Sequence, residues 1–545
     1  MPDPVSRWQP SGVHAASRVV DPAAFAWSDA GWKGVALEDL IVYELHTGTF
    51  TPEGTFEAVI SKLSHLQQLG ITAIELMPVA EFPGGRNWGY DGVCLYAPQS
   101  SYGGPDGLKM LVDACHHQGL AVVLDVVYNH LGPEGNYLNV FAPFFNTAYR
   151  TPWGDALNFD GPDSDGVRRF FIQNALYWVT EFHVDALRLD AVHGIFDFSA
   201  RHILEELATA VHEQAGQLGR RVHVIAESDL NDVRLIHSIS QGGYGLDAQW
   251  LDEFHHALRA LLVNSPLGYF SDFGKLSDLA KALTEGFVHD GGYSPHRRKH
   301  YGSSSRECPG RQFVAFSQNH DQIANASGGD RLSKLATFDQ EKLAAAVLLC
   351  SPYLPLLFMG QEYGETAPFH YFTSFTDPQL AEAVREGRRH EFAAFAGHRP
   401  FADPQDPLTF EQSRLDWGRL ETAQHASVLR LYRDLIALRK RLGCIANCRK
   451  ELTRILYDET LRWMTMERRD AASGCVLLTC NFAAENREIP VPPNEGNRCL
   501  TLWTGAATYG GSPQEVSPPA RLGREEPHIS LPAWQAALYV SPAAG

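Results

Sequence analysis

Two patterns of apolar positions alternate through residues 39–445. Short runs rich in β-branched and apolar residues are each followed by a longer stretch with apolar residues at helical spacing. Strands that alternate with helices in this way are typical of repeated βα units around a parallel sheet. Eight strands are predicted, and eight such units close naturally into a (β/α)8 barrel. The predicted strands are 40–45, 73–76, 121–127, 185–189, 222–226, 246–250, 313–317 and 353–358.

The stretches between these strands predict helices over 56–69, 108–118, 167–182, 203–218 and 340–350, and a last helix over 428–442. The longest apolar run, 343–359, is interrupted by Ser351, Pro352 and Pro355. We interpret it as a buried helix followed by a strand, because a membrane span needs about 20 uninterrupted apolar residues. No transmembrane segment is predicted.

Two connections are too long for ordinary turns. Residues 128–166 follow the third strand and residues 252–311 follow the sixth, and long excursions usually build an active site or a small inserted domain. Beyond residue 445 the pattern changes to short alternating runs separated by Pro and Gly, which predicts an antiparallel β-sandwich over 446–545. The predicted fold class is therefore α/β, with an irregular lead-in over 1–38, a TIM barrel over 39–445 with a small insertion at 128–166, and the C-terminal sandwich.

Composition narrows the class of partner. The 545 residues include 46 Lys and Arg against 64 Asp and Glu, a formal net charge of −18, so nucleic acid and anionic membranes would be repelled. The start of the chain has no basic segment followed by an apolar core, and the nine cysteines include no Cys-x-x-Cys pair. We therefore expect a cytoplasmic protein with reduced thiols and no nucleic-acid or membrane partner.

Three carboxylates follow different predicted barrel strands. Asp190, Glu227 and Asp321 come directly after the fourth, fifth and seventh strands, and residues at the carboxyl ends of barrel strands share one mouth. One such acid alone is as often a helix cap or a loop residue. Three together are expected to raise the pKa of at least one, and a protonated acid beside an ionised one is what glycosidic cleavage requires. With retention the two carboxyl groups would lie about 5 to 5.5 Å apart.

A metal site is the rival interpretation, because His, Asp and Glu also coordinate zinc or magnesium. The sequence contains no His-Glu-x-x-His, no phosphate-binding Gly-x-x-x-x-Gly-Lys-Ser/Thr loop and no Gly-x-Ser-x-Gly elbow. Asn129 and Asp155 carry oxygens suited to calcium, but both types are common in loops. We assign no metal and no cofactor.

Aromatic residues near the predicted mouth are a further signal, since sugar rings stack on aromatic faces. Trp88 and Tyr90 follow the second strand, and Phe369, Tyr371 and Phe372 follow the eighth. Each of them alone is more often a packing residue than a ligand contact.

Four segments, 125–130, 185–193, 225–228 and 316–321, resemble the four familiar regions of glycoside hydrolase family 13, the α-amylase family, in order, spacing and strand context. The resemblance implies that Asp190 is the nucleophile and Glu227 the general acid and base, while Asp321 holds the hydroxyls of the sugar. It also implies that an α-glucan ring is bound by Tyr90, His130, Arg188, His193 and His320, with Arg188 keeping Asp190 ionised and Tyr90 beneath the ring.

Further phrases at 43–54, 318–323, 358–363 and 384–389 resemble the branch of this family that hydrolyses the α-1,4 bond next to the terminal trehalose of malto-oligosyltrehalose. Asp252 and His255 match the same branch and would line the leaving-group side, although Asp252 could equally be a helix N-cap. Branching enzymes share several of these phrases. The alternatives are thus an α-1,4-glucan hydrolase, branching or debranching enzyme, or a carbohydrate-binding relative without catalysis.

Members of this branch usually carry an N-terminal β-sandwich of about a hundred residues, a typical domain size. The resemblance here begins near Gly12, where that module would be ending. For a truncated chain as for a natural variant, we expect the catalytic chemistry to be retained. The sequence does not decide the substrate preference.

Overall fold

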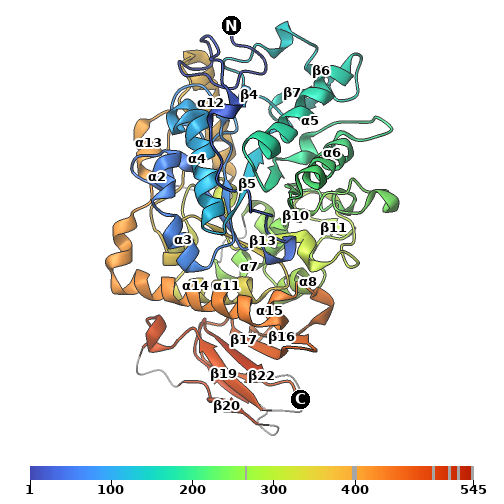
Figure 1. The fold of residues 1–545 in the computed structure, drawn as a ribbon. Coiled ribbons are helices and arrows are strands. Elements are labelled where there is room, and N and C mark those ends of the chain that lie inside the picture. The colour runs from blue at the N-terminus through green and yellow to red at the C-terminus, as the bar shows by residue number, and fades with distance from the viewer. Residues whose placement is uncertain (264–266, 396–401, 494–496, 513–516, 524–527, 542–545) are drawn as a thin grey trace. The chain divides into compact units, whose positions relative to one another are not determined.

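A closed barrel of eight strands forms the main architecture. The computed structural model describes residues 1–263, 267–395, 402–493, 497–512, 517–523 and 528–541 (Figure 1). Its strands follow one another around the barrel in the order β1-β14-β13-β10-β9-β8-β5-β2. The predicted (β/α)8 barrel is confirmed, with strands up to two residues shorter than expected. They are β1 Val42–Leu45, β2 Ala73–Leu76, β5 Ala121–Val126, β8 Ala186–Leu189, β9 His223–Ala226, β10 Ala248–Trp250, β13 Phe313–Phe316 and β14 Leu354–Phe358.

The chain divides into two compact units, residues 1–250 with 368–415 and residues 251–367 with 416–545. The first unit holds β1, β2, β5, β8, β9 and β10. Strands β5 and β8 are buried at every position, as parallel strands covered on both faces usually are. Their parallel register sets Asp125 opposite Arg188, so an acid and a base share one level inside the protein.

Helices of the first unit largely follow the prediction. Helix α6 spans residues 203–218 as expected and ends at Gly219, whose φ of 63° is the left-handed conformation that glycine adopts most easily. The helix predicted over 56–69 is interrupted, because Ser61 Oγ donates to the carbonyl of Ala58 and competes with the helical ladder. The helices are α1 Thr47–Phe50, α2 Phe56–Ile60, α3 Leu63–Leu69, α4 Gly104–His117, α5 Ser164–Glu181, α6 Ile203–Leu218, α12 Pro378–Phe395 and α13 Pro407–Gln412.

Two small hairpins complete this unit. Strands β3 Ala80–Glu81 and β4 Cys94–Pro98 pair antiparallel in the loop after β2. The insertion after the third barrel strand contains a second antiparallel pair, β6 Phe145–Thr151 and β7 Gly154–Leu157.

The second unit contains β13, β14 and the helices packed around them. The apolar run 343–359 forms most of helix α11 and all of β14, as predicted. In the described part of the chain, no helix is both long and apolar enough to cross a membrane. The remaining elements before the C-terminal region are α7 Asp252–Leu262, α8 Leu276–Thr284, β11 Tyr293–Ser294, β12 Lys299–His300, α9 His320–Ser327, α10 Leu332–Leu335, α11 Phe338–Cys350, α14 Ala423–Arg441 and α15 Gly443–Ala446.

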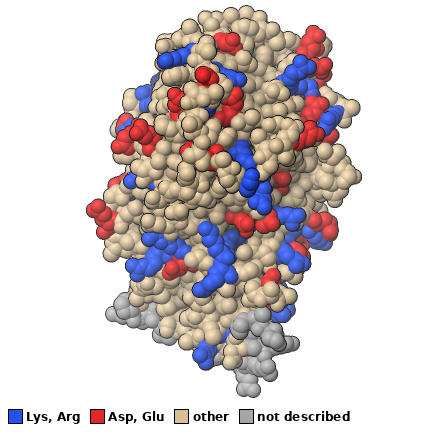
Figure 2. All heavy atoms as spheres, viewed as in Figure 1, with Lys and Arg blue, Asp and Glu red and all other residues tan. Residues whose placement is uncertain are grey.

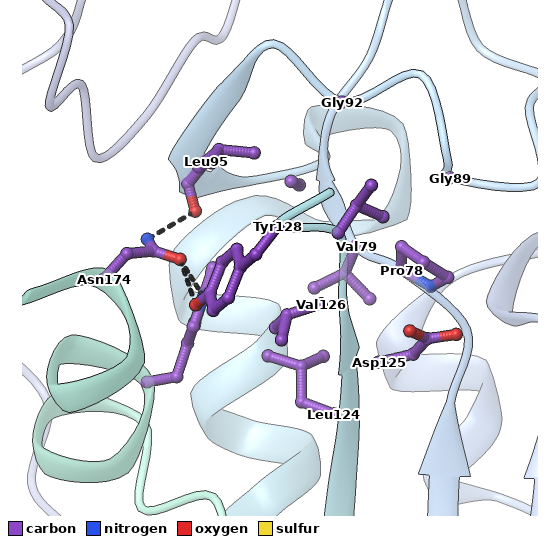
Figure 3. A pocket seen from close by; sticks show the side chains of 13 residues that line it. Pro78, Val79, Gly89, Gly92, Leu95, Leu124, Asp125, Val126, Tyr128 and Asn174 are labelled. Carbon is purple, nitrogen blue, oxygen red and sulfur yellow. Dashed lines mark hydrogen bonds between the residues drawn. The ribbon is translucent and has the colours of Figure 1, made fainter. Parts of the chain in front are cut away.

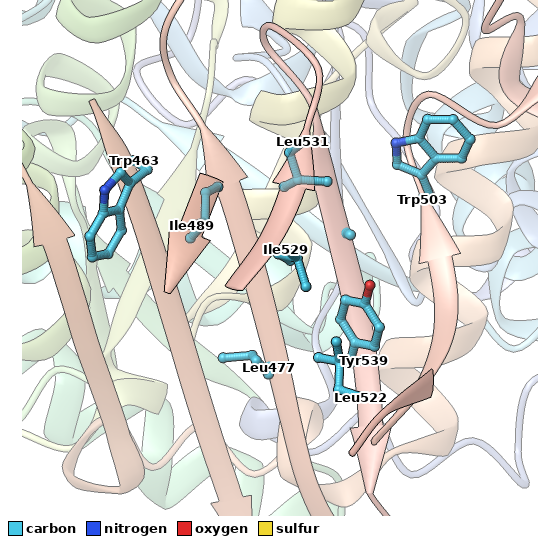
Figure 4. Close-up of a cluster of buried hydrophobic side chains, with 9 residues drawn as sticks. Trp463, Leu477, Ile489, Trp503, Leu522, Ile529, Leu531 and Tyr539 are labelled. Atoms are coloured by element: carbon cyan, nitrogen blue, oxygen red, sulfur yellow. The ribbon is translucent and has the colours of Figure 1, made fainter. Parts of the chain in front are cut away.

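The C-terminal region is an antiparallel sandwich, as predicted. A six-stranded sheet runs in the order β15-β16-β17-β22-β19-β20, and β18 and β21 form a two-stranded sheet. Side chains of both sheets share one core, in which Leu477, Ile489, Ile529 and Tyr539 are at most 1% exposed (Figure 4). The strands are β15 Thr453–Asp458, β16 Trp463–Asp470, β17 Gly474–Asn481, β18 Arg487–Pro490, β19 Arg498–Trp503, β20 Arg521–Leu522, β21 His528–Leu531 and β22 Ala536–Ser541.

Charged side chains of both signs lie on the face seen in Figure 2, where Lys and Arg are interspersed with Asp and Glu. This face therefore suits contact with a neutral ligand better than a field of one sign would.

Replacing Leu477 with Ala should lower the free energy of unfolding of the C-terminal sandwich by about 2–5 kcal/mol, because the side chain is fully buried and its removal leaves a cavity. Chemical denaturation followed by tryptophan fluorescence measures this. Leu461→Ala is the matched control, since that side chain is 44% exposed and its loss should cost less than about 0.5 kcal/mol. Equal effects of the two substitutions would contradict the shared core.

Candidate active site

A buried guanidinium organises the polar residues of the first unit. Arg188 on β8 is 1% exposed, and its Nη1 donates to Asp125 Oδ2 at 2.7 Å and to Asp190 Oδ1 at 3.0 Å. Its Nη2 lies 3.3 Å from Glu227 Oε2. The guanidinium also lies over the indole of Trp250, with 4.2 Å between its central carbon and the ring centroid. Side chains from β5, β8, β10 and the ends of β8 and β9 therefore meet on one cation.

The charge of Arg188 is stabilised by its neighbours. Burial alone would lower its pKa, but the carboxylates of Asp125, Glu227 and Asp190 and the Tyr90 hydroxyl raise that pKa well above its ordinary value. Arg188 is thus a permanent cation, and it compensates the acids that surround it.

Both carboxylate oxygens of Asp190 are held in place. Oδ1 accepts from Arg188, and Oδ2 accepts from Asn129 Nδ2 at 3.1 Å. The main-chain N–H of Asp190 donates to the carbonyl of Val126 at 3.0 Å, which fixes the residue at the carboxyl end of β8. The residue is 8% exposed. This acid is therefore oriented by fixed donors and keeps a small accessible surface.

Glu227 is positioned from the backbone. Its Oε2 accepts from the N–H of Ala191 at 2.5 Å, and its own N–H donates to the carbonyl of Leu189 at 3.0 Å. Ala191 has a φ of 37°, a left-handed conformation that is uncommon for a residue with a side chain and is frequent at functional sites. The strained turn directly after Asp190 thus aims a main-chain donor at Glu227.

His130 contacts Asn129 and the Tyr90 carbonyl as a neutral ring. Burial lowers its pKa to about 4, although its contact with the Tyr90 carbonyl, at 3.0 Å from Nε2, acts in the opposite direction. Its Nδ1 lies 2.8 Å from Asn129 Oδ1, and the indole of Trp153 stacks on the imidazole at 4.9 Å with an interplanar angle of 8°. Trp153 is 44% exposed, so this stack reaches from the interior to the surface.

The aromatic candidates divide into two groups. Tyr90 is partly exposed, and its hydroxyl donates to Asp125 Oδ2 at 2.7 Å. By contrast, Phe369 and Phe372 are fully buried, and Phe369 stacks on Trp88 at 5.4 Å. These two phenylalanines are packing residues, whereas Tyr90 belongs to the cluster around Arg188.

His193 lies on the loop after β8. Its Nδ1 is 3.9 Å from Asp229 Oδ1, and its ring centroid is 6.4 Å from that of Trp153. The side chain is 26% exposed, which places the residue beside Trp153 with an open surface of its own.

The remaining candidates belong to the second unit. His320 and Asp321 begin helix α9, and Asn325 Nδ2 donates to Asp321 Oδ1. Asp252 is the first residue of α7 and accepts from Gln322 Nε2 at 3.3 Å. The N-cap position of α7 is occupied by Leu251, so the interpretation of Asp252 as a helix cap is wrong.

His255 lies in the interior of the second unit. It is 2% exposed, and its ring contacts those of Phe270 and Phe316 at centroid distances of 5.9 and 6.0 Å. Burial lowers its pKa well below the ordinary value, so the ring is neutral.

The space behind β5 is closed. A cavity of about 20 Å³, room for a single water molecule, lies among Pro78, Leu124, Asp125 and Tyr128 (Figure 3). The Tyr128 hydroxyl donates to Asn174 Oδ1 at 2.6 Å, which ties β5 to α5. A sugar ring does not fit there, so this cavity is not the substrate site.

Sequence reasoning missed two residues of this cluster. The sequence predicts Trp250 only as the end of a strand, because its contact with the Arg188 guanidinium leaves no pattern in the neighbouring residues. Trp153 stands between Pro152 and Gly154 in the long insertion, and an exposed tryptophan beside turn residues is a signal that could have identified it. Asp155, whose oxygens suit calcium, forms an ion pair with Arg150, with 3.0 Å between Arg150 Nη1 and Asp155 Oδ1.

Comparisons with known proteins identify the family of the chain. Residues 20–143 match the model of the α-amylase catalytic domain. The chain is 48% identical over 478 residues to the malto-oligosyltrehalose trehalohydrolase of Saccharolobus solfataricus, covering 88% of this chain and 80% of the relative, and 51% identical over 451 residues to that of Arthrobacter ramosus, covering 82% and 78%. A crystal structure of a putative alpha amylase from Salmonella typhimurium superposes with a TM-score of 0.88 at 41% identity, covering 99% of this chain and 88% of that one. The chain therefore belongs to the malto-oligosyltrehalose trehalohydrolase family, glycoside hydrolases with an α-amylase catalytic domain.

Proposed function

We propose that this protein hydrolyses the α-1,4 bond next to the terminal trehalose of malto-oligosyltrehalose and releases trehalose with retention of anomeric configuration. The observation that carries the chemistry is the pair of carboxylates, Asp190 and Glu227, on the single guanidinium of Arg188. The identity to several trehalohydrolases over most of the chain supports the substrate.

Asp190 acts as the nucleophile in this proposal. The guanidinium charge and the Asn129 amide stabilise its carboxylate and leave its orientation fixed, which favours attack on the anomeric carbon. Attack forms a glycosyl ester and breaks the bond to the glycosidic oxygen.

Glu227 acts first as the acid and then as the base. It gives its proton to the departing oxygen, and in the second step it takes a proton from the water that hydrolyses the ester. Retention follows, because each of the two displacements inverts the anomeric centre.

The other predicted residues complete the proposal. Asp321 follows β13, at the position that the family resemblance gives to the acid holding the sugar hydroxyls, so we assign it to that role. Tyr90, His130, His193 and His320 bind the ring that is attacked. We assign Asp252 to the leaving-group side, while the buried His255 supports the position of α7.

We assign the reaction to the cytoplasm. Supporting this, all nine cysteines are free thiols, which is typical of proteins in a reducing compartment.

Chromatography of products tests the proposal. The protein should release trehalose from malto-oligosyltrehalose and leave maltopentaose nearly untouched, and Asp190→Asn should lower kcat by about a thousandfold or more because the nucleophile is lost. Asp406→Asn is the control, since the exposed Asp406 caps helix α13 and Asn caps equally well. Shortened or newly branched chains from amylose, without trehalose, would support an α-glucan hydrolase or a branching enzyme instead.

Arg188→Lys should lower kcat by about a hundredfold or more while the protein stays folded. A lysine ammonium cannot contact Asp125, Asp190 and Glu227 at once or stack on Trp250 as the planar guanidinium does. Steady-state kinetics and circular dichroism measure the two effects. Arg201→Lys, which changes an exposed pair with Glu205, should leave both unaltered. A kcat near that of the unaltered protein would contradict the bridging role.

A further inference from the structure

An aromatic cluster lies on the surface of the first unit, away from the residues assigned above. Tyr149 on β6 stacks on Phe196 with centroids 5.3 Å apart and an interplanar angle of 14°. Phe198 adds a third ring, 5.8 Å from that of Tyr149, and is 77% exposed. We call these three residues the outer platform. A contiguous exposed apolar patch marks a binding surface, and here the exposed ring adjoins a second aromatic pair.

The outer platform is held rigidly. Asp160 accepts from the Tyr149 hydroxyl at 2.9 Å and from the N–H of Phe198 at 3.0 Å through the same oxygen, so it joins the hairpin to the loop. Between the two phenylalanines, Asp197 is 9% exposed and accepts from Arg168 Nη1 at 2.7 Å. The loop thus anchors its acidic residue in the interior while the neighbouring ring of Phe198 stands in solvent. Rings fixed in advance lose little entropy when a ligand stacks on them.

The same two segments also meet next to the active site. Trp153, at the turn of the β6–β7 hairpin, approaches Gly194 so closely that a Cβ there would lie 3.0 Å from the indole. Trp153 stacks on His130, whose neighbour Asn129 holds Asp190. The hairpin and the loop therefore carry aromatic side chains at two places, beside His130, where Trp153 stacks, and at the outer platform. Phe198 stands eight positions after Asp190, which limits the distance between their Cα atoms to roughly 29 Å.

We propose that the outer platform is a binding site for the distal part of a bound α-glucan chain. The inference rests on the proposed function, because it takes the glucan at Asp190 as its starting point. Flat aromatic faces bind the apolar faces of sugar rings, and the neutral glucan meets no charge penalty beside Asp160, whose carboxylate accepts from three donors, Asn146, Tyr149 and Phe198. The platform makes the enzyme favour long glucans over short ones.

Kinetics with substrates of two lengths test the proposal. Phe198→Ala should lower kcat/KM for a long malto-oligosyltrehalose by about two- to tenfold, the loss expected for one aromatic stack, and should affect the shortest cleaved substrate much less. Phe198→Trp restores a ring and should recover the preference. Ile239→Ala, which removes another half-exposed apolar side chain of this unit, is the control and should change neither value. An equal loss with both lengths would overturn the proposal.

Binding to plain amylose separates this proposal from the proposed function. In the inactive Asp190→Asn background, electrophoresis through a gel containing soluble amylose should show retardation that Phe198→Ala reduces and Ile239→Ala does not. This readout requires no trehalose, so the platform can stand even if malto-oligosyltrehalose proves not to be the substrate. Unchanged retardation in Phe198→Ala would overturn the platform. So would sedimentation showing self-association that Phe198→Ala abolishes, because the rings would then be a contact between copies of the chain.

Discussion

Burial of one positive charge constrains the rest of the active site. Moving a guanidinium out of water costs several kcal/mol unless anions and hydrogen bonds compensate it. Arg188 is compensated by Asp125, Asp190 and Glu227, which come from β5 and from the ends of β8 and β9. Moving any one of these acids would remove part of the compensation of the buried charge, so the register of the three strands and the placement of both proposed catalytic acids are linked. The same contacts that stabilise the fold locally thus orient the acids.

Much of the barrel could be predicted from the sequence because its strands are continuous apolar runs bounded by polar residues. The acids at positions 190 and 227 could be found for the same reason, since each stands directly after such a run. Individual strands of the sandwich, such as β15, are harder to predict. Three of its six residues are exposed and three are half-buried, so it lacks a clear apolar pattern. The break in the predicted helix after Ile60 depends on the hydroxyl of Ser61, which the spacing of apolar residues does not reveal.

Aromatic residues show where sequence reasoning ends. Phe369 and Phe198 both stand in loops after barrel strands, yet the first is fully buried and the second is 77% exposed. The local sequence does not distinguish the burial of these two rings. Trp88 stacks on the ring of Phe369, whereas the ring of Phe198 adjoins Tyr149 of the β6–β7 hairpin and stays exposed. Trp250 is a third case, since its role depends on a cation from β8, which is separated from β10 by β9.

The turn at Ala191 has a consequence for how the site tolerates change. Because the donor to Glu227 is a main-chain amide, no ordinary side-chain replacement at position 191 deletes that hydrogen bond; proline alone lacks the required hydrogen. The left-handed backbone narrows the choice further, towards glycine and asparagine and away from β-branched residues. Substitutions at position 191 therefore preserve the hydrogen bond to Glu227 as long as the backbone there keeps its left-handed conformation.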